Sequence, residues 1–204
     1  MSNIDHWNEV YSKKAEAELS WHQDDPSVAL DLMKTAGLTE RSSVIDIGAG
    51  TSRLMDRLLD LGLSDLSALD LSESALAAAR VRLGARENSV KWIAADITRW
   101  EPTQTYDIWH DRAVFHFLVK PDDRDAYIQR VSRSVIPGGH AIIATFALDG
   151  PEKCSGLPVA RYSPSSLAET LGSVFSLMTD QFHLHHTPWG SQQSFQYSLF
   201  RKLN

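Results

Sequence analysis

Acidic residues and glycines come together in one short stretch, where their types and spacing could bind a small molecule. Asp46 is followed by Gly48 and Gly50 in the segment VIDIGAGTS. Glycines are needed where backbone passes close to a ligand, because a side chain would fill the ligand's space. A carboxylate here would repel a pyrophosphate but can hydrogen-bond an ammonium group. Arg53 stands where a dinucleotide fingerprint has its third glycine. The stretch is therefore predicted to bind a ligand with an amino group, or to be a tight turn that binds no ligand.

A second acidic residue stands at the end of the next predicted strand, residues 66–71. Asp70 follows Asp46 by 24 positions, close to the spacing of roughly 20 expected for an acid that binds ribose hydroxyls. Leu71 beside it could pack on adenine. The alternative is that Asp70 is a dipole partner for a helix that begins near Ser72.

Further polar groups follow the third and fourth predicted strands. Asp96 comes after strand 90–95 and could accept from an adenine amino group, with Ile97 offering apolar contact. The mouth of strand 106–110 is denser in polar groups, and these are His110, Asp111, Arg112 and His116. Because ligands bind at the carboxyl ends of such strands, this density predicts a functional site.

The elements that position these residues follow from hydrophobic periodicity. Residues 43–47 read as a buried strand, and 53–61 as a helix with leucines at helical spacing. Strand, glycine turn and helix form the first crossover of a Rossmann-like sheet. The last two strand-like runs, 175–185 and 195–200, fit a terminal antiparallel pair on an otherwise parallel sheet.

Composition narrows the class further. The 204 residues suit one α/β domain over 1–204, and a net charge of −6 argues against a general nucleic-acid surface. The single cysteine, Cys154, completes no Cys-based zinc site, so no metal is expected. No segment reaches the length of a membrane span. We therefore expect no nucleic-acid or membrane partner, a cytoplasmic location, and a monomer or weak homodimer.

Two segments outside the periodic elements are candidates for covering a site. The N-terminal arm, residues 1–25, contains Trp7, Tyr11 and Trp21, which either anchor the arm to the core or cover a cofactor cleft. Residues 147–162 are rich in helix and strand breakers, as substrate loops often are.

Several of these features occur together in a known order. The glycine stretch, Asp70, Asp96, strand 106–110 and the segment 137–139 (Pro-Gly-Gly) resemble class I S-adenosylmethionine-dependent methyltransferases over residues 40–146. The arm and the blocks 110–116, 154–158 and 186–190 resemble a bacterial branch of small, single-domain members.

The resemblance implies an α/β fold, a Rossmann-like three-layer sandwich whose seven-stranded, mostly parallel sheet has an antiparallel C-terminal strand. It implies S-adenosylmethionine as cofactor and S-adenosylhomocysteine as product. Most members have glycine where this chain has Ser52, which leaves less room. The expected cofactor-binding residues are Trp7, Tyr11, Trp21, Asp46, Gly48, Ala49, Gly50, Ser52, Asp70, Leu71, Asp96, Ile97 and His110.

The implied reaction is in-line displacement at the sulfonium methyl group, which depends on alignment and desolvation. A base is needed only if the acceptor must lose a proton, and His116 and Asp111 are the candidates. Arg112 could clamp an anionic acceptor through its fork, or form a salt bridge with Asp111 or a helix acid.

We expect a small-molecule acceptor between the segment 110–116 and the loop 150–160. The alternatives are a protein-lysine methyltransferase and a cofactor-binding protein without transferase activity. A nicotinamide oxidoreductase would need a phosphate-tolerant loop, which Asp46 and Arg53 disfavour. The Asn/Asp-Pro-Pro-Tyr/Phe motif of adenine and glutamine methyltransferases is absent, and residues 110–113 stand in its place.

Overall fold

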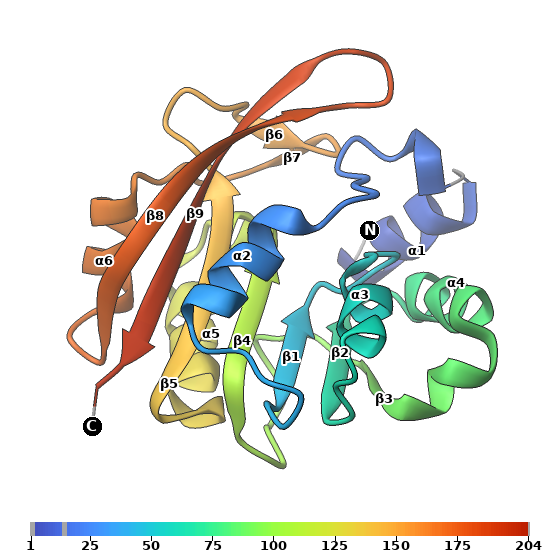
Figure 1. Ribbon diagram of the computed structural model, residues 1–204. Coiled ribbons are helices and arrows are strands. Elements are labelled where there is room, and N and C mark those ends of the chain that lie inside the picture. The colour runs from blue at the N-terminus through green and yellow to red at the C-terminus, as the bar shows by residue number, and fades with distance from the viewer. Residues whose placement is uncertain (1–2, 14–15, 204) are drawn as a thin grey trace.

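A seven-stranded sheet runs through the middle of the molecule (Figure 1). The computed structural model describes residues 3–13 and 16–203. The strand order is β3-β2-β1-β4-β5-β9-β8. The strands are β1 (Val44–Ile47), β2 (Leu66–Asp70), β3 (Val90–Ala94), β4 (Tyr106–Arg112), β5 (Val135–Phe146), β8 (Phe175–His186) and β9 (Gln192–Lys202).

The pairing in the sheet is the one expected from the sequence. Neighbouring strands from β3 to β5 pair in parallel, whereas β9 is antiparallel to both β5 and β8. The order reverses at β1, with β2 on one side and β4 on the other, and ligands bind at such a switch point in open α/β sheets. The predicted Rossmann-like fold with an antiparallel C-terminal strand is confirmed.

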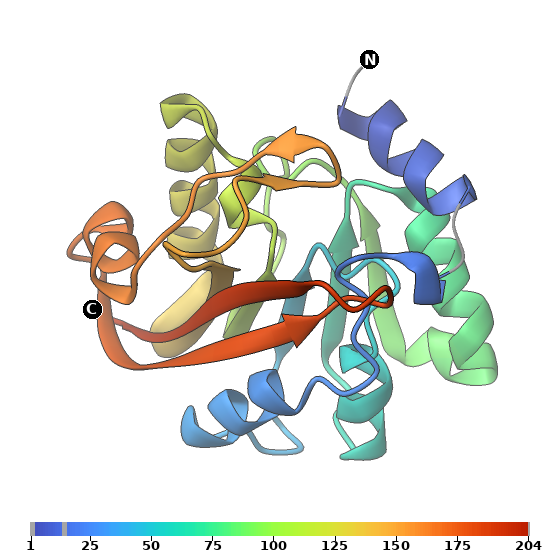
Figure 2. The same ribbon diagram turned by 90° about the horizontal axis from the view of Figure 1, so that it is seen from above.

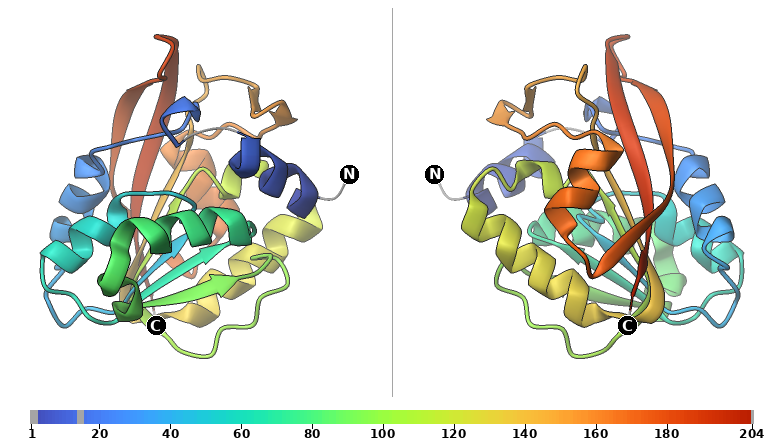
Figure 3. Two further views of the ribbon diagram at one scale, coloured as in Figure 1. Left: turned by 90° about the vertical axis from the view of Figure 1, so that its right-hand side faces the viewer. Right: turned by 90° about the vertical axis from the view of Figure 1, so that its left-hand side faces the viewer.

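Helices cover both faces of the sheet, as Figure 3 shows from two sides. Alternate residues of each buried strand enter two separate cores. Val44 of β1 belongs to the core beneath α2, α3 and α4, whereas Ile45 belongs to the core beneath α5 and α6. The helices are α1 (Asn3–Lys13), α2 (Ser27–Thr35), α3 (Leu54–Asp60), α4 (Glu73–Leu83), α5 (Pro121–Ser134) and α6 (Pro164–Leu171), with short 3-10 turns η1 (Glu16–Glu18), η2 (Gly84–Ser89) and η3 (Phe115–Phe117).

Strand β4 is longer than the sequence predicted, and this changes where its polar residues lie. The ladder continues to Arg112, which pairs with Ala144 of β5. Because side chains alternate along a strand, His110 and Arg112 share one face while Asp111 lies on the other. A single polar mouth after residue 110 is therefore replaced by two faces with different surroundings.

The predicted breaker-rich segment 147–162 contains a small hairpin. Strands β6 (Lys153–Cys154) and β7 (Leu157–Pro158) pair antiparallel, with Ser155 at φ 49° and Gly156 at φ 78° in the turn. Figure 2 looks down on the carboxyl ends of the parallel strands, with α1 and this hairpin next to one another beside them.

A buried hydrogen-bond chain ties β4 to α5. The Tyr127 hydroxyl donates to Asp111 Oδ2 at 2.6 Å and accepts from Trp109 Nε1 at 2.9 Å. All three residues are fully buried. Asp111 also accepts from the backbone N–H groups of Val114 and Phe115, which fixes the turn after β4.

Substitution Tyr127→Phe tests this chain. It removes one donor and one acceptor from buried partners, so we expect the free energy of unfolding to fall by about 2–4 kcal/mol. Tyr106→Phe is the matched control, because the Tyr106 hydroxyl makes a single neutral bond to Ser67 Oγ, worth about 1 kcal/mol. Urea denaturation measures both values, and equal losses would contradict the proposed weight of the Tyr127 chain.

Candidate active site

The carboxyl ends of β1, β2, β3 and β4 surround one cavity of about 440 Å³. Gly48, Asp70 and Asp96 contribute to its wall from three successive strand ends. Leu71 and Ile97 lie beside these acids and supply apolar surface. These five residues, which the sequence singled out as candidates, therefore lie together at this end of the sheet.

The two glycines of the first turn are required by backbone conformation and by space. Gly48 has φ 67°, and a Cβ there would lie 2.2 Å from Val114 Cγ2. Gly50 has φ 47°, and a Cβ there would lie 2.6 Å from the Tyr11 hydroxyl and 3.4 Å from Asp70 Oδ2. Both positions favour glycine because its lack of a Cβ permits positive φ and close approach.

Asp70 holds this turn in place. Its Oδ2 accepts from the Gly50 N–H at 2.8 Å, and its Oδ1 accepts from the Ser72 N–H at 2.7 Å, at the start of α4. Burial raises the pKa of the carboxyl to about 6, against the opposing effect of these two bonds. The carboxylate keeps free lone pairs toward the cavity. The two roles that the sequence offered for Asp70, binding a ligand and interacting with the start of the next helix, are therefore compatible.

Asp96 is tied locally as well. Its Oδ1 accepts from both the backbone N–H and the hydroxyl of Thr98, at 2.9 and 2.7 Å. Thr98 also lines the cavity and was not picked out from the sequence. Its signal would have been the Asp-x-Thr spacing of an Asx turn.

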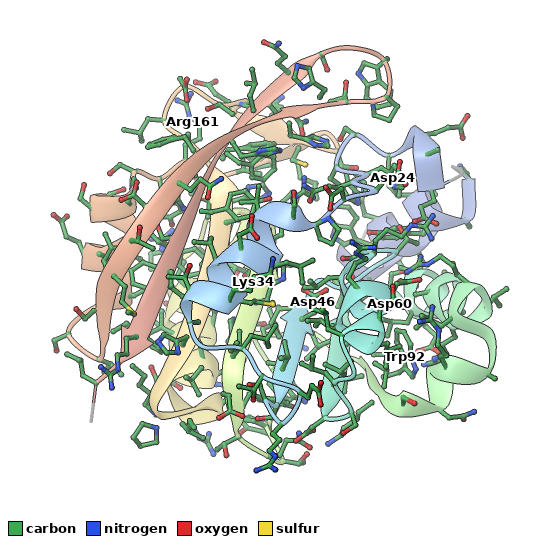
Figure 4. The ribbon with its side chains drawn as sticks, in the orientation of Figure 1. Asp24, Lys34, Asp46, Asp60, Trp92 and Arg161 are labelled. Atoms are coloured by element: carbon green, nitrogen blue, oxygen red, sulfur yellow. The ribbon has the colours of Figure 1, made fainter. Side chains whose placement is uncertain are left out.

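A smaller cavity of about 50 Å³ lies on the other side of the glycine turn. Asp46 and His110 form its buried wall, with Asp46 Oδ1 2.7 Å from His110 Nδ1. Figure 4 labels Asp46 on β1. Neither Asp46 Oδ2 nor His110 Nε2 has a hydrogen-bond partner among the described residues. Ala49 and Ser52 also line this cavity.

The aromatic residues of the arm form one side of both cavities. Trp7 packs edge-on against Trp21 and Phe117, with ring centroids 5.5 and 5.2 Å apart. Tyr11 and Trp21 line both cavities, and Trp7 lines the larger one. Helix α1 is also fixed to the start of α4, because Ser72 Oγ donates to Asn8 Oδ1 at 2.8 Å. The arm therefore anchors and covers at once.

Arg112 faces both cavities from the end of β4. Its Nε donates to the Tyr197 hydroxyl at 3.0 Å and one terminal nitrogen donates to the Trp21 carbonyl at 2.8 Å. The expected alternative, a salt bridge to Asp111, is not formed, because the two side chains lie on opposite faces of β4. The second terminal nitrogen, Nη2, is buried without a partner in the described part of the chain.

The prediction that Asp111 acts at the acceptor needs correction. Asp111 is fully buried, lines neither cavity and accepts three hydrogen bonds within the protein. Burial raises its pKa to about 6, opposed by its bond to Tyr127. Its place on the opposite face of β4 makes it part of the scaffold.

The prediction for His116 needs the same correction. Its ring is fully buried, packs against Phe117 and Phe146, and lines neither cavity. Burial, and then the charge of Arg112, lowers its pKa to about 3. A neutral imidazole with so low a pKa is a poor base. The 3-10 turn after β4 directs this side chain into the core.

The structure adds further residues to the larger cavity. Ala113 has φ 74°, a conformation that non-glycine residues rarely adopt outside functional turns. Val114 and Phe117 follow it and face the cavity. Cys154, from the hairpin, lines the same wall as a buried thiol whose pKa burial raises to about 12. No periodic pattern in the sequence distinguishes these residues from core positions.

Taken together, the sheet order and the cavity at its switch point place the chain in the class of Rossmann-like domains. Residues 44–139 match a family model described as a methyltransferase domain. This part of the chain is therefore similar to methyltransferase domains, the family that the resemblance in the sequence implied.

Curated relatives that match this chain over part of their length are named methyltransferases. The mouse eEF1A lysine and N-terminal methyltransferase is 23% identical over 141 residues, covering 69% of this chain and 20% of that protein. Trans-aconitate 2-methyltransferase of Rhizobium etli is 30% identical over 112 residues, covering 54% of this chain and 41% of that protein. The chain thus spans about a fifth of the length of the first of these relatives.

A solved structure matches over the full length. The N-methyltransferase NodS from Bradyrhizobium japonicum, in complex with S-adenosylhomocysteine, has 16% identity and a TM-score of 0.76, with 100% of both chains covered. This similarity is one of fold.

In residues 3–13 and 16–203, no helix is long and apolar enough to cross a membrane.

Substitution His116→Phe tests the assignment of His116 to the core. A pKa lowered from 6.5 to about 3 gives stability that is complete above about pH 6.5 and is lost as pH falls toward 3. The full difference corresponds to roughly 5 kcal/mol. We expect the variant to lose most of the acid-side decline in unfolding free energy between pH 6.5 and 4.

Urea denaturation across this pH range measures the effect. His186→Phe is the control, since His186 is exposed on β8. If wild type and His116→Phe decline in parallel with pH, His116 is not buried in the neutral state.

Proposed function

We propose that the protein transfers a methyl group from S-adenosylmethionine to a small-molecule acceptor. The observation that carries this proposal is the convergence of Gly48, Asp70, Asp96 and the aromatic arm on one cavity at the switch point of the sheet. The matching methyltransferase domain supports the cofactor.

The residues of the larger cavity fit the nucleoside half of the cofactor. Asp70 would accept from the ribose hydroxyls through lone pairs that Gly50 and Ser72 leave free. Asp96 Oδ2 would accept from the adenine amino group, because Thr98 occupies only Oδ1. Leu71 and Ile97 supply the apolar contact that a flat base needs.

The smaller cavity fits the amino-acid half. Asp46 Oδ2 and His110 Nε2 are buried and unpartnered, and unpaired buried polar atoms are costly. An ammonium group would pair with both if His110 donates to Asp46 through Nδ1 and accepts through Nε2. Gly48 and Ala49 present little side chain to this cavity, and Ser52 also lines it.

Catalysis would then rest on positioning. When bound, the cofactor supplies an activated methyl group whose positive charge favours displacement. The protein contributes alignment, through the fixed turn after β4, and exclusion of water, through Trp7, Trp21 and Phe117. Asp111 and His116 are withdrawn into the scaffold, so neither provides a base.

A small acceptor is favoured by the covering of the cavity. Helix α1 and the β6–β7 hairpin lie at its edge, and His6 Nε2 is 3.3 Å from Ser155 Oγ across the two. The relative that methylates trans-aconitate also supports a small acceptor. The alternative is a protein lysine, which the eEF1A methyltransferases support. A lysine side chain would need an open groove between α1 and the hairpin.

Calorimetry and a transfer assay test the proposal. Wild-type protein should bind S-adenosylhomocysteine, and labelled S-adenosylmethionine should label members of a panel of small acids, thiols and amines. Transfer to lysine-containing peptides alone would favour the protein acceptor. Product binding without transfer to any panel member would favour a binding protein, and absence of product binding would overturn the cofactor assignment.

Substitution Gly50→Ala tests the cofactor turn. The new Cβ would displace the Tyr11 hydroxyl and press on Asp70, so we expect affinity for S-adenosylhomocysteine to fall by at least about tenfold, or 1.4 kcal/mol. Gly37→Ala is the control, because Gly37 also has positive φ, at 86°, but has no atom near its Cβ position. Equal affinities in the two variants, measured by calorimetry, would show that the turn does not contact the cofactor.

A further inference from the structure

Arg112 lines both cavities and is held in place by three contacts. Two of its nitrogens donate to the Tyr197 hydroxyl and the Trp21 carbonyl, and its Cζ lies 4.8 Å from the centroid of the Phe195 ring. These three contacts come from β9, the arm and β9 again. They fix the guanidinium plane and leave Nη2 as the nitrogen without a partner in the described residues.

No carboxylate among the described residues lies within ion-pair distance of Arg112, and its guanidinium takes part in none of their ion pairs. Burial, together with the Arg112 charge, lowers the pKa of His116 to about 3 and of His185 to about 4, so both rings are neutral near pH 7. Cys154 stays a thiol. A half-buried cation without an anionic partner is costly and attracts one.

Arg112 lies at some distance from the nucleoside half of the site, because the two are carried by strands that are not neighbours in the sheet. Asp70 ends β2, and β1 lies between β2 and β4. Two strand spacings place the end of β4 about 10 Å from the end of β2, and the end of β3 is one spacing further. Ala113, Phe117 and Cys154 line the same cavity as Arg112.

We propose that the methyl acceptor is a small organic carboxylate whose carboxylate group is bound by Nη2 of Arg112. The proposal rests on the proposed methyltransferase function and adds the chemical class of the acceptor. Trp7, Trp21 and Phe117 supply apolar surface for the rest of that molecule. Arg112 binds the anion as a substrate-contacting residue, and Tyr197 is the positioning residue that holds its fork.

A carboxylate at this position has two possible sources, the acceptor and the amino-acid tail of the cofactor. Because Arg112 lines the smaller cavity as well, the experiment must separate them. The probes are phenylacetate, glutarate and phenylacetamide, the last being an uncharged analogue of the first. Binding is measured by calorimetry at pH 7.5 and fixed ionic strength, with the protein saturated with S-adenosylhomocysteine.

For wild-type protein we expect at least one carboxylate to bind, and phenylacetamide to bind at least about tenfold more weakly than phenylacetate. Arg112→Gln should lose carboxylate affinity by at least about tenfold while affinity for S-adenosylhomocysteine stays within about twofold. Arg112→Lys keeps the charge and loses the planar guanidinium, so its carboxylate affinity should lie between those of wild-type protein and Arg112→Gln. Arg86→Gln is the matched control, since Arg86 is exposed and pairs with Asp60.

Three results would overturn the carboxylate assignment while leaving the proposed function intact. These are failure of both carboxylates to bind the product complex, equal affinity for phenylacetate and phenylacetamide, and loss of S-adenosylhomocysteine affinity in Arg112→Gln. The last would assign Arg112 to the cofactor tail. Failure of wild-type protein to bind S-adenosylhomocysteine would instead overturn the proposed function. If Arg112→Gln does not fold, Arg112→Lys and the wild-type comparison of acid and amide decide.

Discussion

The buried carboxylate of Asp70 is the interaction on which the site depends. It joins the glycine turn after β1 to the start of α4, through bonds of 2.8 and 2.7 Å to two backbone N–H groups. The turn can approach Asp70 and Tyr11 this closely because Gly50 has no Cβ. One carboxylate thus fixes the conformation of the loop, the direction of the helix and one wall of the cavity.

The two-residue period of β4 is the second constraint. It places His110 and Arg112 toward the cavities and Asp111 toward α5, where Tyr127 and the turn after β4 occupy its oxygens. The same bonds hold Val114 against Gly48. Asp111 therefore shapes the site without entering it, which gives a structural reason for an acid at this position.

The N-terminal arm and the β6–β7 hairpin complete the site from distant parts of the sequence. Trp7 packs against both Trp21 and Phe117, Cys154 lines the same cavity from the hairpin, and His6 contacts Ser155 between the arm and the hairpin. A cavity closed by segments this far apart in sequence exists only in the folded chain. Its aromatic walls and the unpaired Arg112 nitrogen favour a small acceptor with an apolar body and an anionic end.

The sequence alone determined the sheet, the glycine turn and the acids at the ends of β2 and β3, because these depend on local periodicity and on short, fixed spacings. It also predicted the antiparallel C-terminal pair of strands, and that the aromatic residues of the arm anchor it to the core or cover a cleft. It could not determine how far β4 extends, since the ladder to Arg112 is completed by β5 more than 30 residues later. That extension decided which of His110, Asp111 and Arg112 face the cavity. The burial of His116 was likewise decided by tertiary packing, because only contact with Phe146 and Phe117 turns a polar residue in a short 3-10 turn into a core side chain.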